Sequence, residues 1–69
     1  MVEVFKTNVQ KVSQAKKLIA LLFEQFPDNR INFDLNDCDK ILRIEVDNFE
    51  VQHIIMLVTE NGFMCDVLE

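Results

Sequence analysis

The sequence has few of the residues that form flexible loops, cross-links and many active sites. Its 69 residues include one Gly, one Pro, one His, two Cys and no Trp or Tyr. Two cysteines cannot form the several disulfides that stabilise small secreted scaffolds. A single glycine argues against a Gly-rich loop for binding phosphate groups. No Ser-His-Asp arrangement or second histidine is present, so we expect no enzyme activity and no cofactor.

Long apolar runs and a disordered composition are also missing. The longest unbroken apolar stretch, 18–23, is far shorter than the ~18 residues that span a bilayer. A hydrophobic content of 49% with six Phe is too high for a disordered chain. The alternating N-terminal residues are unlike a secretory signal. These features predict a single soluble domain over 1–69, in the cytoplasm with reduced thiols, and no membrane partner.

The charge is acidic overall but unevenly distributed. Twelve acidic and seven basic residues give a net charge of −5, which argues against nucleic acid as a partner. Four of the seven basic residues lie near the start of the chain: Lys6, Lys11, Lys16 and Lys17. Such a basic corner fits docking to an acidic protein, self-association, or simply a solvated helix face.

Alternating apolar residues predict four strands. They lie at 2–7, 31–35, 40–46 and 63–68. Stretches with helical spacing separate the first strand from the second and the third from the fourth, so the order is β-α-β-β-α-β. Right-handed crossovers place both helices on one face of a four-stranded antiparallel sheet. The expected fold class is α+β, a ferredoxin-like two-layer sandwich.

The two helices have start and stop signals. Asn8 is the expected N-cap of the first helix, and Pro27 ends it. Asp47 or Asn48 is expected to cap the second helix, and Gly62 to end it. The residues expected to face the core are Val12, Ala15, Ile19, Leu22, Phe23 and Phe26 in the first helix, and Val51, Ile54, Ile55 and Val58 in the second.

The element order, the length and the segment 61–68 (Asn-Gly-Phe-Met-Cys-Asp-Val-Leu) resemble the heavy-metal-associated domain. Small copper chaperones and the metal-binding domains of metal-pumping ATPases belong to this family. The resemblance covers the whole chain and is most specific at 62–65, with the strand-loop-helix opening at 2–22 as its second part. The family binds a soft metal through Met-x-Cys-x-x-Cys in the loop after the first strand, where thiolates suit Cu(I).

The residues at the family's metal-binding positions are not soft ligands. Alignment with the family's first helix places Lys6, Asn8 and Lys11 at the Met position and the two Cys positions. Lys11 also brings a positive charge to the place of a cation. The resemblance therefore implies a scaffold that has lost the metal motif, without metal transfer by the family's mechanism.

A different set of donors leaves metal binding open as an alternative. Cys38 lies between Asp37 and Asp39 in the turn after the second strand, and one thiol with two carboxylates can bind a divalent ion weakly. The same residues also fit a polar turn with a free thiol. Cys65 is expected to be a buried packing residue and His53 to face solvent.

Apolar residues that the core does not need predict a contact surface. Val2 and Val4 are taken to face inward, which leaves Phe5 on the open face of the sheet. The candidate contact residues are Phe5, Ile41, Met64 and Leu68 on the sheet, and Leu21, Met56 and Leu57 on the helices. Scattered surface hydrophobes are the alternative interpretation. The predicted function is a non-catalytic binding module that contacts another protein or forms a homodimer.

Overall fold

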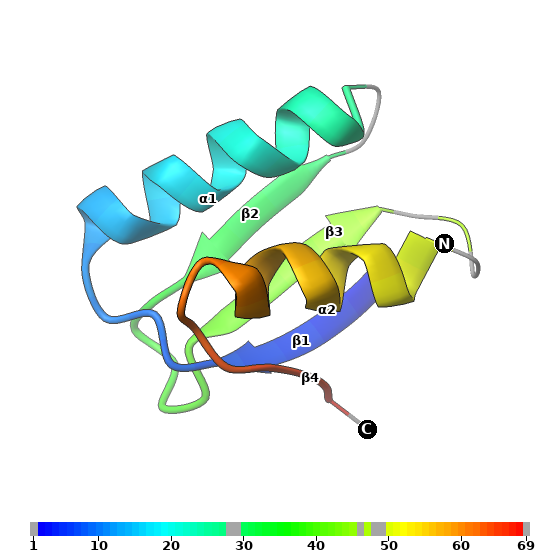
Figure 1. Cartoon of the computed structure of the whole chain (residues 1–69). Coiled ribbons are helices and arrows are strands. Elements are labelled where there is room, and N and C mark those ends of the chain that lie inside the picture. The colour runs from blue at the N-terminus through cyan, green and yellow to red at the C-terminus, as the bar shows by residue number, and fades with distance from the viewer. Residues whose placement is uncertain (1, 28–29, 46, 48–49, 69) are drawn as a thin grey trace.

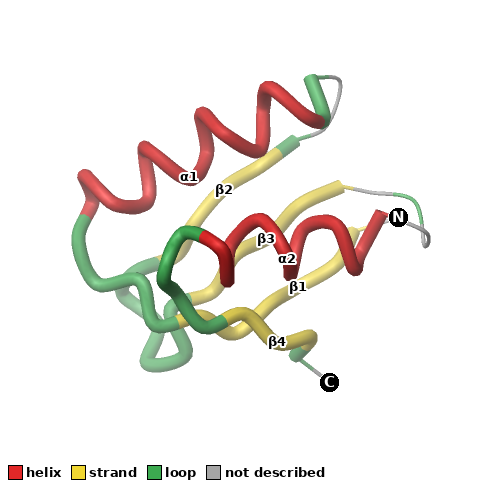
Figure 2. The backbone as a smooth tube through the Cα atoms, viewed as in Figure 1, coloured by secondary structure: helices red, strands yellow, loops and turns green. Residues whose placement is uncertain are grey.

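The computed structural model has the six elements in the predicted order (Figure 1). It describes residues 2–27, 30–45, 47 and 50–68. The elements are β1 (Val2–Thr7), α1 (Val12–Gln25), β2 (Ile31–Asp34), β3 (Ile41–Glu45), α2 (Val51–Glu60) and β4 (Cys65–Val67). The strands form one antiparallel sheet in the order β2-β3-β1-β4, and the helices cover one of its faces (Figure 2). The predicted ferredoxin-like α+β fold is confirmed.

The helices of the described residues are too short or too polar to cross a membrane. The core lies between these helices and the sheet. Its buried members are Phe5, Val9, Ala15, Leu18, Leu22, Phe26, Leu42, Ile44, Ile54, Val58 and Cys65. Half-buried side chains from β2 and α2 pack around this cluster. The core-facing residues predicted for α2 are therefore confirmed, with Ile54 and Val58 buried and Val51 and Ile55 packed against the cluster.

The pairing register fixes which side of β1 faces the helices. Phe5 lies opposite Leu42 of β3, and directly opposed residues share a face of the sheet. Both side chains are 0% exposed, so Phe5 belongs to the core. The prediction that Phe5 lies on the open face, with Val2 and Val4 inward, is wrong. A phenyl ring buries more apolar area than a valine, and Val2 is 62% exposed.

The open face of the sheet is a mixed polar surface. The opposed pairs on it include Lys6 with Asp66, Val4 with Arg43, and Asp34 with Ile41. Ile41 lies on this face as predicted, but it is only 3% exposed and stays outside the core cluster. Apolar side chains therefore do not dominate the face that the sequence predicted for contact.

The core stripe of α1 is rotated from its predicted position. The buried helix residues are Ala15, Leu18 and Leu22. Val12 and Phe23, both predicted for the core, are 62% and 54% exposed. Because Leu18 turns inward, these two side chains lie on the flank of the helix rather than beneath it.

Asn8 does not cap α1, contrary to the prediction. The N-cap is Lys11, and the Gln14 side-chain oxygen accepts a hydrogen bond from the Lys11 backbone N–H at 3.2 Å. The Asn8 Oδ1 atom instead accepts a hydrogen bond from the Met64 backbone N–H at 2.7 Å. The residue thus ties the loop after β1 to the segment before β4. The predicted stop holds, since α1 ends at Gln25, two residues before Pro27.

The ends of α2 follow local sequence signals. Gly62 has a φ of 91°, its N–H donates to the Thr59 carbonyl, and the Phe63 N–H donates to the Val58 carbonyl. This is a Schellman ending, which confirms the predicted stop. At the start, the N-cap is Glu50, and its carboxylate accepts a hydrogen bond from the Asp47 N–H at 3.0 Å. Asp47 is therefore not the N-cap that the sequence predicted, and the other predicted cap, Asn48, lies outside the described residues.

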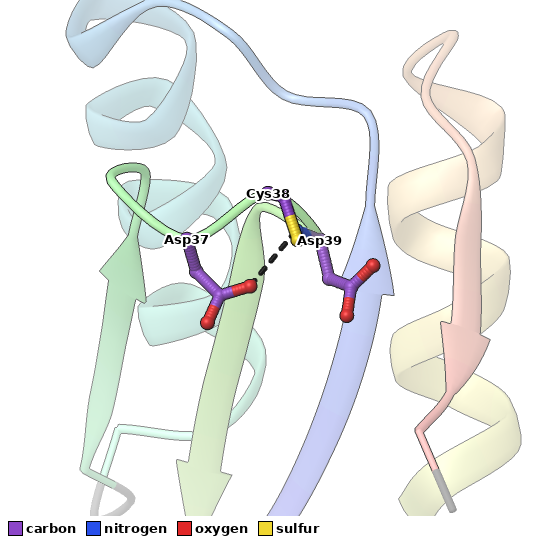
Figure 3. Close-up of side chains that lie close together, drawn as sticks. All are labelled: Asp37, Cys38 and Asp39. Atoms are coloured by element: carbon purple, nitrogen blue, oxygen red, sulfur yellow. Dashed lines mark hydrogen bonds between the residues drawn. The ribbon is translucent and has the colours of Figure 1, made fainter.

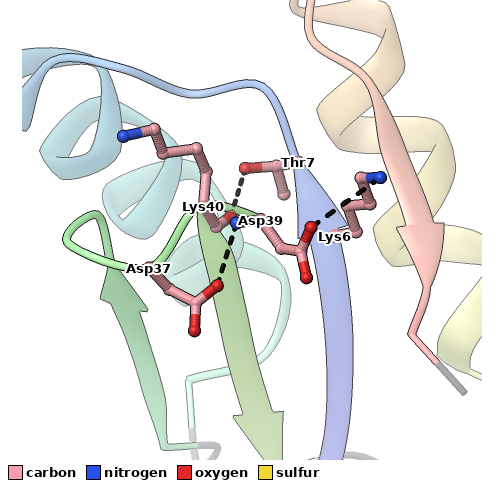
Figure 4. A network of polar contacts seen from close by, with 5 residues as sticks. All are labelled: Lys6, Thr7, Asp37, Asp39 and Lys40. Atoms are coloured by element: carbon pink, nitrogen blue, oxygen red, sulfur yellow. Dashed lines mark hydrogen bonds and ion pairs between the residues drawn. The ribbon is translucent and has the colours of Figure 1, made fainter.

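A buried hydroxyl joins β1 to the β2–β3 loop (Figure 4). Thr7 is 3% exposed, donates to the Lys40 carbonyl at 2.6 Å and accepts from the Val9 N–H at 3.3 Å. The Thr7 N–H also donates to the Asp39 carbonyl at 3.1 Å. These bonds hold the loops of this end against the sheet.

Replacing Thr7 tests this connection. Thr7→Val keeps the shape but removes a buried donor and acceptor, so we expect the free energy of unfolding to fall by about 1–3 kcal/mol. Thr7→Ser retains the hydroxyl and should lose clearly less. Urea unfolding followed by circular dichroism measures both. Equal stability of the valine and serine variants would show that the hydroxyl does not hold the loop.

Candidate functional site

Three connecting segments meet at one end of the sheet, as the topology predicts. The β2–β3 loop is bound to Thr7 of β1, and the loop before β4 is bound to Asn8. This end contains Lys6, Asn8 and Lys11, which the predicted resemblance to the heavy-metal-associated domain places at that family's ligand positions. The side chains present there decide what chemistry this end can support.

The three residues at the family's ligand positions have other contacts. The Lys6 ammonium lies 3.8 Å from the Asp39 carboxylate, in an ion pair whose side chains are 47% and 36% exposed. Asn8 binds the Met64 backbone N–H, and Lys11 is the exposed N-cap of α1. These positions offer no thiolate to a soft cation, and two of them are positively charged.

The turn donors predicted as an alternative metal site do lie close together (Figure 3). One ligand atom from each of Asp37, Cys38 and Asp39 lies within 4.8 Å of the others. The Asp37 Oδ1 atom accepts a hydrogen bond from the Asp39 N–H at 2.9 Å, and Asp39 pairs with Lys6. The Asp37 carboxylate thus already stabilises the turn, and the Asp39 carboxylate already forms an ion pair with Lys6. Cys38 and Asp37 are exposed, so the group is open to solvent.

The two cysteines are free and differ in environment. Cys38 is exposed and Cys65 is buried, as predicted. Burial raises the pKa of the Cys65 thiol from its ordinary value of 9.0 to about 12, and the Asp66 carboxylate adds to the rise. The Cys65 thiol therefore stays protonated and unreactive at neutral pH. His53, on α2, is exposed as predicted.

The predicted contact residues do not form one patch. Phe5 is buried, and Leu57 packs against the core. Leu21 is half-buried. The residues that remain well exposed are Met56 at 56%, Met64 at 43% and Leu68 at 37%. Met56 comes from α2, whereas Met64 and Leu68 lie just before and just after β4. Because Phe5 is buried, it cannot form a contact surface with Met64 and Leu68 on the open face of the sheet.

The sequence prediction missed a groove between α1 and β2. It has a volume of about 460 Å³. Its lining residues are Val12, Ala15, Lys16, Ile19, Ile31, Asn32, Phe33, Asp34, Leu35 and Asn36. β2 is the terminal strand of the sheet, and α1 runs beside it (Figure 1). The groove therefore follows an edge of the sheet rather than its open face.

One sequence signal pointed to this groove. Val12, Lys16, Ile19 and Phe23 are spaced by four, three and four residues, which places them along one side of α1. We refer to these four residues as the flank stripe. Assigning Val12, Ile19 and Phe23 to the core concealed it, because a helix with two adjacent apolar stripes looks like one broad stripe in the sequence.

The high pKa of Cys65 predicts a loss of stability in alkaline solution. The unfolded thiol ionises above pH 9, whereas the folded thiol keeps its proton to about pH 12. The free energy of unfolding should therefore fall between pH 9 and 12, by at most about 1.4 kcal/mol per pH unit from this group. Cys65→Ala should show a shallower fall than Cys38→Ala in urea unfolding across this range. Equal slopes would contradict the assignment.

Comparisons of the chain with protein-family models, with curated proteins and with solved structures found no match.

Proposed function

We propose that the chain is a non-catalytic binding module that acts by protein–protein contact in the cytoplasm, with both thiols reduced. Its scaffold is similar to the heavy-metal-associated domain without the family's metal ligands. The α1–β2 groove is the observation that carries this proposal. The strand order and the two helices on one face support the similarity of the scaffold.

The lining of the groove suits binding rather than chemistry. Its apolar residues come from both elements, and its polar residues are Lys16, Asn32, Asp34 and Asn36. This lining includes no thiol, hydroxyl or imidazole, so it offers no Cys, Ser, Thr or His nucleophile. Val12 within the groove is 62% exposed, and Phe23, farther along the same side of α1, is 54% exposed. A contiguous apolar surface beside a strand edge is typical of protein contact.

The position of the groove favours an extended segment as the bound element. A terminal strand presents unpaired backbone N–H and C=O groups, and a segment that adds to the sheet satisfies them. The groove beside that edge can then receive alternate side chains of the added strand. This arrangement combines backbone affinity with side-chain selectivity.

A photo-crosslinking amino acid tests the proposal. At Lys16 it lies in the groove, and at Glu24 it is exposed on the same helix but outside the groove. In cells that express the chain, irradiation should give protein adducts from position 16 and clearly fewer from position 24. Adducts with another copy or with a different protein both support a binding module. No adduct above the position 24 background would overturn it.

Metal binding at the β2–β3 turn is the second candidate. The three donor atoms within 4.8 Å of one another favour it. The Lys6 ammonium at 3.8 Å from Asp39 weighs against it, because a bound cation must compete with that positive charge.

Titration with Zn²⁺, Ni²⁺ and Cu⁺, followed by amide NMR shifts, separates the two candidates. The binding-module proposal expects no saturable shift at residues 36–39. Cys38→Ser removes the thiol from this exposed turn and serves as the control. A saturable shift in the wild type that this variant abolishes would make metal binding the better function.

A further inference from the structure

The free edge of β2 has a defined hydrogen-bonding pattern. The Glu45 N–H donates to the Arg30 carbonyl at 2.9 Å, so the backbone groups of residue 30 point toward β3. The direction alternates along an antiparallel strand. The N–H and C=O groups of Ile31 and Phe33 therefore point away from the sheet. They are the groups that a further strand would pair with.

The side chains of β2 are divided between the two faces. Ile31 and Phe33 lie opposite the buried residues Ile44 and Leu42, so they share the helix-covered face. Asn32 and Asp34 lie on the open face, and Arg30 continues this alternation. The edge thus has two apolar side chains on one face and a basic, an amide and an acidic side chain on the other.

This pattern is self-complementary. If two copies of β2 run antiparallel about a two-fold axis at Asn32, Ile31 of each copy lies opposite Phe33 of the other. The backbone groups of Ile31 and Phe33 point away from their own sheet and toward the added strand. Each Ile31–Phe33 pair therefore forms two N–H···O=C hydrogen bonds, one in each direction. The same alignment sets Arg30 opposite Asp34, twice by symmetry. Opposite charges and apolar pairs both stabilise directly opposed positions.

The open-face pairs fall where side chains approach closely. Pairs 30–34 and 32–32 are the non-hydrogen-bonded type, with Cα atoms about 4.5 Å apart. Among the described residues, neither Arg30 nor Asp34 forms an ion pair within 4.0 Å inside the chain. In the paired sheet each Arg30 would lie between Glu45 of its own copy and Asp34 of the other.

The flank stripe of α1 is also complementary to a second copy of itself about the same two-fold axis. Val12, Lys16 and Ile19 line the groove on the side of the β2 edge, and the helical spacing continues to Phe23. An axis at Asn32 sets the two α1 helices antiparallel above the extended sheet. The Val12 end of one stripe then faces the Phe23 end of the other. These two residues are the more exposed apolar members of the stripe.

We propose that the occupant of the groove and the edge is a second copy of this chain, paired through β2 with the axis at Asn32. The proposal rests on the proposed function and names its partner. The other edge is a weaker candidate, because β4 has three residues against four in β2 and offers a shorter row of backbone groups to an added strand.

Charge exchange tests the alignment. Arg30→Asp places acid opposite acid, and Asp34→Arg places base opposite base, so each variant alone should raise the dimer dissociation constant about tenfold or more. An equimolar mixture restores both opposite-charge pairs and should dimerise like the wild type. Arg43→Asp makes the same charge change on the open face one strand inward and should leave dimerisation unchanged. Sedimentation from micromolar to millimolar concentration measures all four, with circular dichroism as the check on folding.

A thiol at the axis gives a test that does not depend on charge. In a Cys38→Ser background, Asn32→Cys brings two thiols to opposed positions whose Cα spacing of about 4.5 Å suits a disulfide. Mild oxidation should give a cross-linked species of twice the 8.1 kDa chain mass. Arg43→Cys in the same background is exposed but farther from the axis, and it should cross-link poorly.

The outcomes separate this inference from the proposed function. A wild-type chain that stays monomeric overturns the second copy as occupant. The same conclusion follows if the charge variants leave the dimer dissociation constant unchanged and no cross-link forms at position 32. Adducts from position 16 with a different protein would then still support a binding module. If the wild-type chain is monomeric and position 16 also gives no adducts above background, both proposals are overturned.

Discussion

The inward orientation of Phe5 determines the rest of the structure. β1 is a central strand, paired with β3 on one side and β4 on the other. Because opposed residues share a face, placing Phe5 in the core assigns Leu42 of β3 to the core as well, and through it Phe33 of β2. A one-residue slip of β1 would turn each of its side chains to the other face of the sheet and take Phe5 out of the core. The side of β1 that Phe5 occupies is therefore linked, through strand pairing, to the residues on both faces of the sheet.

Because Phe5 faces the core, exposed apolar residues lie along α1 and do not form a cluster with Phe5 on the open face of the sheet. With Phe5 inside, the open face carries Lys6, Arg43 and Asp66 among its exposed side chains. Val12 and Phe23, which the core does not use, lie on the flank of α1. The part of the molecule best suited to contact is therefore the boundary between the two layers, where a helix flank and a strand edge run together.

Local signals in the sequence were sufficient for the order of the elements and for the ends of both helices, but not for their first residues. Pro27 and Gly62 act through their own backbone geometry, so their effects on the two helices were predictable. The polar turn at Asp37 and Asp39 was predictable for the same reason, since its hydrogen bond spans two residues. The fold class follows from these local features together with the handedness of crossovers.

Features that depend on distant contacts were not predictable in this way. Apolar residues occur on both sides of β1, with Val2 and Val4 on one side and Phe5 on the other. Only packing against α1 and α2 decides which side faces the core. Asn8 has the side chain of an N-cap, yet a hydrogen bond to Met64, far along the chain, takes its oxygen. The groove needs the strand order as well, because β2 becomes an edge only when β3 lies between it and β1.

The two edge strands of the sheet differ in length, with four residues in β2 and three in β4. A sheet with two long, compatible edges can add copies head to tail without limit, which is how fibres grow. Here a pairing through β2 consumes the longer edge of both copies and leaves only the short ones exposed. In the proposed dimer the assembly would be closed at two chains, and any growth beyond it would require pairing through β4.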